Sequence, residues 1–324
     1  SDVAPIIRGL LTDKKSNKTF IINHRINDDI KAFMNGVDVN RYSQVGTITP
    51  DHVIRIKPYP LIINLKNNAS IDDFHKLAKV SIKKYVEKYK SYYQKYSKRK
   101  NLTMLDPYPR IIYVKGIGMF SVGDNYKSSI IAGDLAETNA RVITSVEKST
   151  KYKTISEKDI FDVEYWSLEQ AKLNKKSKLL EGKIVVITGS TGTIGYETYK
   201  VFKEQGAEVV LIDCNKTQIS KIQSSIPDLC LYADVTKREN IQNIFKIICE
   251  RFGGIDILIS NAGSVSDGPI ADVSDKILKQ IFEDNFFSHQ ICASEAVKIM
   301  LKQENKGCLL FNISKQSVNP GKNF

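Results

Sequence analysis

The stretch Lys183-Ile184-Val185-Val186-Ile187-Thr188-Gly189-Ser190-Thr191-Gly192-Thr193-Ile194-Gly195 decides the fold of the second half of this chain. The apolar run from Ile184 to Ile187 predicts a strand that is buried on both faces. Glycines then recur at every third position, as a tight turn requires when its backbone must approach a ligand closely. The stretch therefore predicts a strand, a glycine turn and a helix whose first N–H groups face a phosphate.

The alternation of strand and helix patterns continues to the end of the chain. Apolar runs at 184–187, 209–212, 229–232, 255–259 and 309–313 alternate with helical patterns. Strands that are apolar on both faces and are separated by helices indicate a doubly wound parallel sheet. We therefore predict an α/β domain over residues 181–324.

Asp213 ends the second apolar run, about 20 residues after the glycine turn. At this place a carboxylate accepts the ribose 2′-hydroxyl of NAD and repels the 2′-phosphate of NADP. The alternative is an ordinary turn residue that faces solvent. Because Asp213 follows a predicted strand, we favour the nucleotide role and predict NAD as the cofactor.

Several further positions, in the same order along the chain, resemble the short-chain dehydrogenase family. Asp234 and Val235 resemble the pair that contacts the adenine, and Asn261-Ala262-Gly263 resembles the turn that borders the cofactor. Asn285 resembles the asparagine that kinks its helix around a water in the proton relay, and Ser314 the serine that hydrogen-bonds the reacting oxygen. The predicted cofactor-binding residues are thus Gly189, Thr191, Gly192, Ile194, Gly195, Asp213, Asp234, Val235, Asn261, Ala262 and Gly263, and the predicted catalytic residues are Asn285 and Ser314.

This resemblance implies hydride transfer between a carbinol carbon and a nicotinamide ring. In the family a tyrosine moves the hydroxyl proton, and a lysine lowers the pKa of that tyrosine. The family pattern places the tyrosine about 13 residues after Ser314, with the lysine about four residues later, and both positions lie beyond Phe324. We therefore expect the sequence to be a fragment whose sheet ends in an unpaired apolar edge.

Thr193 is a departure from the family pattern. The non-extended branch of the family has glycine where this chain has Thr193, and the spacing of Gly189, Gly192 and Gly195 is more similar to the extended branch. The Asn-Ala-Gly turn and Asn285 favour the non-extended branch. A sugar-nucleotide epimerase or dehydratase of the extended branch therefore stays open as an alternative enzyme.

The composition changes near residue 165, and the first half has an irregular α+β pattern. We predict strands at 19–23, 53–57 and 110–114, and helices at 28–34, from Ser70 onward and at 126–146. The segment 165–180 indicates a tethering helix and a polar linker. The predicted domains are 1–165, a helical linker at 166–180, and 181–324.

Three stretches resemble the bifunctional rhamnulose-1-phosphate aldolase/lactaldehyde dehydrogenase family, in which a class II aldolase precedes a short-chain dehydrogenase. These stretches are 49–55, 161–172 and 319–324. The resemblance implies an α+β class II aldolase-related domain followed by a truncated Rossmann-type domain. It also implies a small hydroxy or aldehyde substrate such as lactaldehyde, in deoxysugar catabolism such as that of rhamnose.

The first half lacks the pattern of a metal-dependent aldolase. Class II aldolases hold zinc with histidines that include a His-x-His pair, and no two of the four histidines form such a pair here. Ile117 stands where the resemblance would place a metal histidine. We therefore predict no metal site, interpret His52 as structural rather than a ligand, and interpret Gly116 and Gly118 as turn glycines rather than a phosphate cradle.

The chain carries a net charge of +12, and its positive charge is concentrated at 76–100. Lysines alternate there with tyrosines at helical spacing, which predicts a long amphipathic helix with a packed aromatic face and a solvated lysine face. The alternative is a non-catalytic NAD-binding or polyanion-binding module, whose binding would depend steeply on salt. We do not expect nucleic acid as the partner.

The cysteine pattern and the apolar runs indicate the cellular environment in which the protein works. The five cysteines form no C-x-x-C pair, which argues against a disulfide framework and a zinc site. No apolar run approaches the roughly 20 residues of a membrane helix, and the start shows no secretory signal. We expect a cytoplasmic protein with a small-molecule substrate and no membrane partner. The family resemblance implies a homo-oligomer for the full-length protein.

Overall fold

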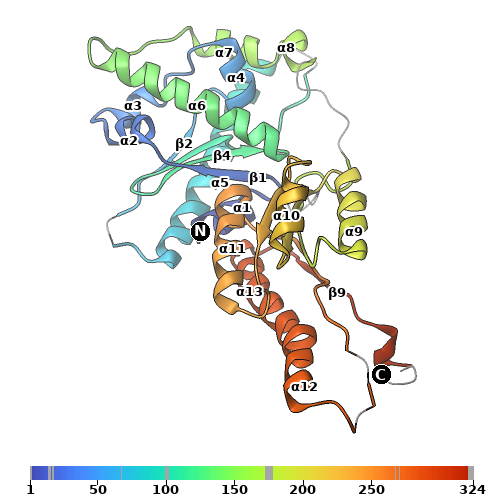
Figure 1. Cartoon of the computed structure of the whole chain (residues 1–324). Coiled ribbons are helices and arrows are strands. Elements are labelled where there is room, and N and C mark those ends of the chain that lie inside the picture. The colour runs from blue at the N-terminus through green and yellow to red at the C-terminus, as the bar shows by residue number, and fades with distance from the viewer. Residues whose placement is uncertain are drawn as a thin grey trace. The chain divides into compact units, whose positions relative to one another are not determined.

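The computed structural model describes residues 2–13, 16, 18–66, 68–98, 102–171, 178–266, 268–269 and 271–319. These residues fall into two compact units, an N-terminal unit within residues 2–177 and a C-terminal unit within residues 178–324 (Figure 1). Each unit has its own sheet. Among the described helices, none combines the length and the apolar character needed to cross a bilayer.

The N-terminal unit is built on a four-stranded sheet of order β1-β4-β3-β2, in which only the β2–β3 pair is parallel. Its strands are β1 (Ile21–Arg25), β2 (Leu61–Ile63), β3 (Ile111–Val114) and β4 (Gly118–Gly123). Its helices are α1 (Val3–Leu11), α2 (Asp28–Asn35), α3 (Val39–Tyr42), α4 (Pro50–Ile56), α5 (Ile71–Ser97), α6 (Tyr126–Glu147), α7 (Glu157–Glu164) and α8 (Ser167–Ala171). Helices α1 and α5 pack on one face of the sheet, and α2 and α6 pack on the other.

The strand predicted at 53–57 is wrong, because this segment forms helix α4. Thr49 has an extended backbone, Pro50 occupies the first turn and Asp51 lies beside it, which are the features of a helix start. The apolar residues Val53, Ile54 and Ile56 are all buried. A short run that is buried on several sides has no clear period, so helix and strand look alike in the sequence.

Helix α5 confirms the prediction of a long amphipathic helix that starts after Ser70. The Ser70 hydroxyl accepts the Asp73 N–H at 3.1 Å, and the Asp73 carboxylate accepts the Ser70 N–H at 3.1 Å, which forms a capping box. Farther along the helix, Tyr89 and Tyr92 are buried in a cluster that also contains Phe161 of α7. The aromatic face of α5 is therefore part of a core.

The C-terminal unit is a five-stranded sheet of order β7-β6-β5-β8-β9, and every pair in it is parallel. Its strands are β5 (Ile184–Thr188), β6 (Glu208–Asp213), β7 (Leu229–Tyr232), β8 (Ile257–Ser260) and β9 (Cys308–Phe311). Its α-helices are α9 (Thr193–Glu204), α10 (Lys216–Gln223), α11 (Arg238–Phe252), α12 (Asp275–Phe282) and α13 (Ser288–Gln303). The prediction of a doubly wound parallel sheet is confirmed.

The strand order places a switch point at β5. The chain builds outward from β5 to β6 and β7, and then returns to add β8 and β9 on the other side. In open sheets of this kind, ligands bind beside the carboxyl ends of the strands at the switch point. The glycine turn follows β5 directly, so it lies at this place.

The segment predicted as a tethering helix and linker, 165–180, is described only in part. The structure has the short helix α8 there, and residues 172–177 lie outside the described residues. Most of the resemblance stretch 319–324 lies outside them as well.

Candidate functional site

The glycine turn after β5 needs glycine at two of its three glycine positions. Gly189 has a φ of +61°, and a Cβ there would lie 2.8 Å from the Ala262 Cα. A Cβ at Gly195 would lie 2.4 Å from the Gly189 carbonyl oxygen. At Gly192 the nearest atom would be 3.5 Å away, so a side chain fits there. The turn is therefore packed closely on its inner side and open at Gly192.

Helix α9 presents an open N-terminus beside this turn. It begins at Thr193 with Gly192 as its N-cap, and no side chain of the described residues caps it. The first N–H groups of a helix have no partner within the helix and attract anions. Thr193 is exposed, and the Ile194 side chain is 63% exposed, so the surface around this helix start is open.

Asp213 connects the glycine turn to the end of β6. Its carboxylate oxygens accept the N–H groups of Thr191 and Asn215, each at 2.9 Å. The residue is only 8% exposed, so it is not a solvent-facing turn residue. An ionised carboxylate has about four acceptor positions, so these two hydrogen bonds leave it able to accept others.

The Asn-Ala-Gly turn after β8 is hydrogen-bonded to the glycine turn. The Thr188 hydroxyl accepts the N–H groups of Asn261 and Ala262 at 2.9 and 3.0 Å. The Asn261 side-chain amide donates to the carbonyl oxygens of Thr188 and Gly189 at 3.0 and 3.1 Å. These bonds join the two strand ends that border the switch point.

Two residues of this arrangement were not predicted from the sequence, Thr188 and Asn312. The Asn312 side-chain amide donates to the Asn261 side-chain oxygen at 2.8 Å, which connects the end of β9 to the same turn. Their signal in the sequence is a polar side chain at or just after the end of a buried strand. This signal is weak because such residues also end strands that border no site.

Asn285 fastens its helix to the loop that follows β8. Its side-chain amide donates to the carbonyl oxygens of Ser264 and Ile281 at 2.9 and 3.1 Å, and its side-chain oxygen accepts the Ser264 N–H at 3.1 Å. A Cβ at Gly263 would lie 2.6 Å from that oxygen. Residues Glu283–Phe287 form a π-helical turn, a distortion that is common at functional sites. The role of Asn285 in a proton relay stays a prediction.

Ser314 and the pair Asp234-Val235 lie after the outer strands of the sheet. Ser314 is exposed and caps the 3₁₀-helix Lys315–Ser317, where its hydroxyl accepts the Gln316 N–H at 3.2 Å. Asp234 accepts the N–H and the hydroxyl of Thr236 at 2.9 and 2.6 Å, and it is half-buried like Val235. The described contacts join neither residue to the glycine turn, although both follow carboxyl strand ends.

In the N-terminal unit, the residues considered for a metal or phosphate site are His52, Gly116 and Gly118. Among the described residues, no group of three or more His, Cys, Asp and Glu side chains could hold a metal ion. His52 is buried, its Nδ1 lies 2.7 Å from the Thr49 hydroxyl, and burial lowers the pKa of His52. Gly116 and Gly118 have positive φ angles between β3 and β4. These placements favour a structural histidine and turn glycines.

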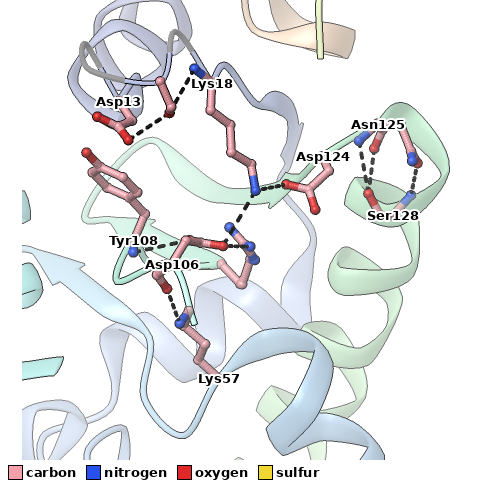
Figure 2. A network of polar contacts seen from close by, with 10 residues as sticks. Asp13, Lys18, Lys57, Asp106, Tyr108, Asp124, Asn125 and Ser128 are labelled. Atoms are coloured by element: carbon pink, nitrogen blue, oxygen red, sulfur yellow. Dashed lines mark hydrogen bonds and ion pairs between the residues drawn. The ribbon is translucent and has the colours of Figure 1, made fainter. Parts of the chain in front are cut away.

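The N-terminal unit does contain a partly buried polar network around Asp106 (Figure 2). Asp106 forms an ion pair with Arg110, and its carbonyl oxygen accepts a hydrogen bond from the Lys57 ammonium at 2.6 Å. That ammonium also lies 3.6 Å from the ring centroid of Tyr89. Burial lowers the pKa of Lys57 to about 8. Figure 2 shows Lys18 beside Asp124, at 3.0 Å. Because the network joins segments far apart in sequence, we interpret it as structural.

Comparison with known families divides the chain in the same order as the two units. Residues 1–173 match the second domain of class II aldolases, and residues 183–324 match the short chain dehydrogenases. The chain belongs to the family of class II aldolase second domains, and it continues into a short-chain dehydrogenase domain. The predicted order, with an aldolase-related domain followed by a short-chain dehydrogenase, is confirmed.

Two curated relatives match different shares of the chain. An uncharacterized oxidoreductase of Bacillus subtilis, YuxG, is 32% identical over 99% of this chain and 48% of its own length. Short chain aldehyde dehydrogenase 1 of Euphorbia lathyris is 34% identical over 44% of this chain and 51% of its own length. The chain thus spans about half the length of the curated relatives it matches. The crystal structure of gox2181 aligns over 43% of this chain and 56% of its own, at 23% identity and a TM-score of 0.41.

Proposed function

We propose that the C-terminal unit binds NAD and forms the cofactor-binding part of a short-chain dehydrogenase that acts on a small hydroxy or aldehyde compound. One observation carries this proposal. At the switch point of the sheet, an uncapped helix N-terminus lies beside a glycine turn, and the Asp213 carboxylate is bonded to that same turn. A dinucleotide needs these three features together.

The residues at the switch point fit a dinucleotide. Gly189 and Gly195 allow the backbone to approach a pyrophosphate, whose charge suits the first N–H groups of α9. The free acceptor positions of Asp213 suit the ribose hydroxyls and oppose a 2′-phosphate, which favours NAD over NADP. When bound, NAD supplies a nicotinamide ring that accepts or donates a hydride.

The substrate side of the proposal rests on Ser314. Its hydroxyl oxygen accepts the Gln316 N–H, so the hydroxyl proton stays able to donate to a substrate oxygen. Asn285 and Asn261 act as positioning residues, because each holds a loop at the edge of the cofactor site. A substrate oxygen held by Ser314 would be oriented for proton transfer.

Lactaldehyde, produced in the breakdown of rhamnose or another deoxysugar, is the substrate that we propose. The support is the order of the two domains together with the resemblance to the bifunctional aldolase/dehydrogenase family.

We also propose a cytoplasmic homo-oligomer. Exposed apolar residues along α12 and the following π-helical turn, Ile277, Leu278, Phe282 and Phe286, are surfaces that a second subunit would cover.

An extended-branch epimerase or dehydratase is the second candidate. The observation in its favour is the spacing of Gly189, Gly192 and Gly195. An epimerase regenerates its NAD within each turnover, whereas a dehydrogenase accumulates NADH. The polyanion-binding alternative loses support because Tyr89 and Tyr92 are buried, so their rings cannot stack on bases.

Substitution of Gly192 tests the proposed cofactor site. Gly192→Asp places a carboxylate at the open N-cap of α9, where the backbone is extended and space is free. The cap should stabilise the helix by about 0.5–1 kcal/mol. The same negative charge should repel a pyrophosphate and weaken NADH binding by about tenfold or more.

Calorimetric titration of NADH, paired with thermal unfolding, measures both effects. Gly192→Asn is the matched control, since it caps the helix without adding a charge, and it should bind NADH more tightly than Gly192→Asp. Unchanged NADH affinity in Gly192→Asp would place the dinucleotide elsewhere and overturn the proposed site.

A further inference from the structure

A cavity of about 300 Å³ lies in the N-terminal unit, among residues of α3 and the turn after it, the sheet-edge strand β2 and helix α5. Its walls include Ser43, Gln44, Ser81, Lys84 and Lys88. The volume is at the lower end of the range for small-molecule sites. All its lining residues belong to the N-terminal unit, so the cavity is independent of the proposed NAD site.

The cavity is lined by two cationic groups, the ammonium groups of Lys84 and Lys88. Lys84 and Lys88 lie four residues apart on α5, a spacing at which like charges destabilise a helix. Within the described part of the chain, neither ammonium has a carboxylate at ion-pair distance, and no acidic residue lines the cavity. Other α5 lysines do have such partners, since Lys83 pairs with Glu87 and Lys95 with Glu157.

Lys88 is held in place by uncharged partners. Its ammonium donates to the Gln44 side-chain oxygen at 2.9 Å and lies 4.8 Å from the ring centroid of Tyr59. Partial burial lowers the pKa of Lys88, and the Glu157 carboxylate opposes this effect only in part. A bound anion would reverse this effect and would also relieve the repulsion between Lys84 and Lys88.

The other walls suit the body of a small organic molecule. The hydroxyls of Ser43 and Ser81 and the amide of Asn40 can hydrogen-bond hydroxyl or carbonyl groups. The Gln44 amide is already engaged, because it donates to the Pro60 carbonyl oxygen at 3.1 Å and accepts from Lys88. Apolar wall residues, including Ile62 of β2, offer contact to a short carbon skeleton. A few polar groups beside an apolar wall are the usual make-up of a ligand site.

We propose that this cavity binds a small organic anion, whose phosphate or carboxylate group lies between the ammonium groups of Lys84 and Lys88. The serine hydroxyls and the Asn40 amide hold the polar atoms of its carbon chain. The inference does not depend on the dinucleotide site, so either proposal can fail without the other.

Thermal unfolding of the whole chain tests the site, with inorganic phosphate, glycerol 3-phosphate and glycerate as probes. Each titration is made at constant ionic strength against chloride. We expect at least one probe to raise the melting temperature of the N-terminal unit saturably, by about 2–6 °C. A response to the phosphates alone identifies a phosphate site, and a response to glycerate alone identifies a carboxylate site.

The variant Lys84→Gln/Lys88→Gln should show no rise in melting temperature with the probes. Without any probe it should unfold at the same temperature as the wild type or slightly higher, because a repulsive pair of charges has been removed. Lys79→Gln/Lys90→Gln is the matched control, since it removes the same charge from exposed positions of α5 outside the cavity. Lys84→Arg/Lys88→Arg should retain a saturable response. The proposal is wrong if none of the three probes acts saturably on the wild type, or if the two glutamine variants respond equally.

Discussion

At the scale of single residues, the glycine turn shows which positions the fold requires. We expect Gly195→Ala to destabilise the C-terminal unit by about 1–3 kcal/mol, because its Cβ would meet the backbone at Gly189 and Ser190. Gly192→Ala should cost less, about 0.5–1 kcal/mol, because its Cβ would make only an ordinary contact with the Gly189 carbonyl oxygen at 3.5 Å and alanine is a poorer N-cap than glycine. Urea unfolding of both variants measures the difference, and equal losses would contradict the packing described.

Lys57 predicts a pH dependence of stability in the N-terminal unit. Its φ of +64° and its 4% exposure place a lysine where burial lowers the pKa to about 8. A lysine whose pKa is depressed by folding binds fewer protons in the folded than in the unfolded state. The charged Lys57 therefore destabilises the folded state below pH 8, and this destabilisation is lost as the pH rises toward the ordinary pKa of lysine.

Lys57→Met removes this contribution. Relative to wild type, the variant should gain about 1–3 kcal/mol of stability as the pH falls from 10 to 7. Denaturant unfolding at several pH values measures that difference, and titration of other groups cancels between the two proteins. If the difference in unfolding free energy between the two proteins stayed constant with pH, folding would not lower the pKa of Lys57.

The predictability of the site also varies from residue to residue. The place of Asp213 at the carboxyl end of a strand was predictable, because the apolar run before it and its short distance from the glycine turn are both visible in the sequence. Its role in binding NAD stays a prediction. Asn312 was not predictable, because it contacts Asn261, 51 positions away along the chain. A hydrogen bond across a sheet leaves no local pattern in the sequence.

At the scale of elements, Asn285 joins the π-helical turn between α12 and α13 to the loop after β8. Asn285→Ala removes the acceptor of the Ser264 N–H, so exchange of that amide proton with solvent should accelerate about tenfold or more. Asn285→Asp keeps this acceptor and should protect Ser264 better than the alanine variant. Nuclear magnetic resonance measures the exchange at this single amide, and equal rates in all three proteins would rule out the proposed anchor.

Elements with strong local signals were predicted, and elements shaped by distant contacts were not. Helix α5 is specified by its cap at Ser70 and by the helical spacing of its tyrosines, which bury one face. The short segment of α4 carries a proline start but lacks a period, because its apolar side chains are buried on several sides. Tertiary packing, rather than the local pattern, decides such a segment.

At the scale of the whole molecule, the two sheets differ in how far the sequence determines them. The parallel sheet follows from alternating strands and helices, because crossover connections in a doubly wound sheet obey strict rules. The N-terminal order β1-β4-β3-β2 pairs Ile21 with Gly123, about one hundred residues later along the chain. No periodicity in the sequence indicates that pairing.

The central claim, that the dehydrogenase domain binds NAD through Asp213, is tested most directly by titrating the chain with NADH and NADPH. We predict that NADH binds at least about tenfold more tightly, a difference of roughly 1.4 kcal/mol, because the carboxylate opposes a 2′-phosphate. Asp213→Asn should reduce the ratio between the affinities for NADH and NADPH. Equal or tighter binding of NADPH by the wild type, or no saturable binding of either nucleotide, would contradict the claim.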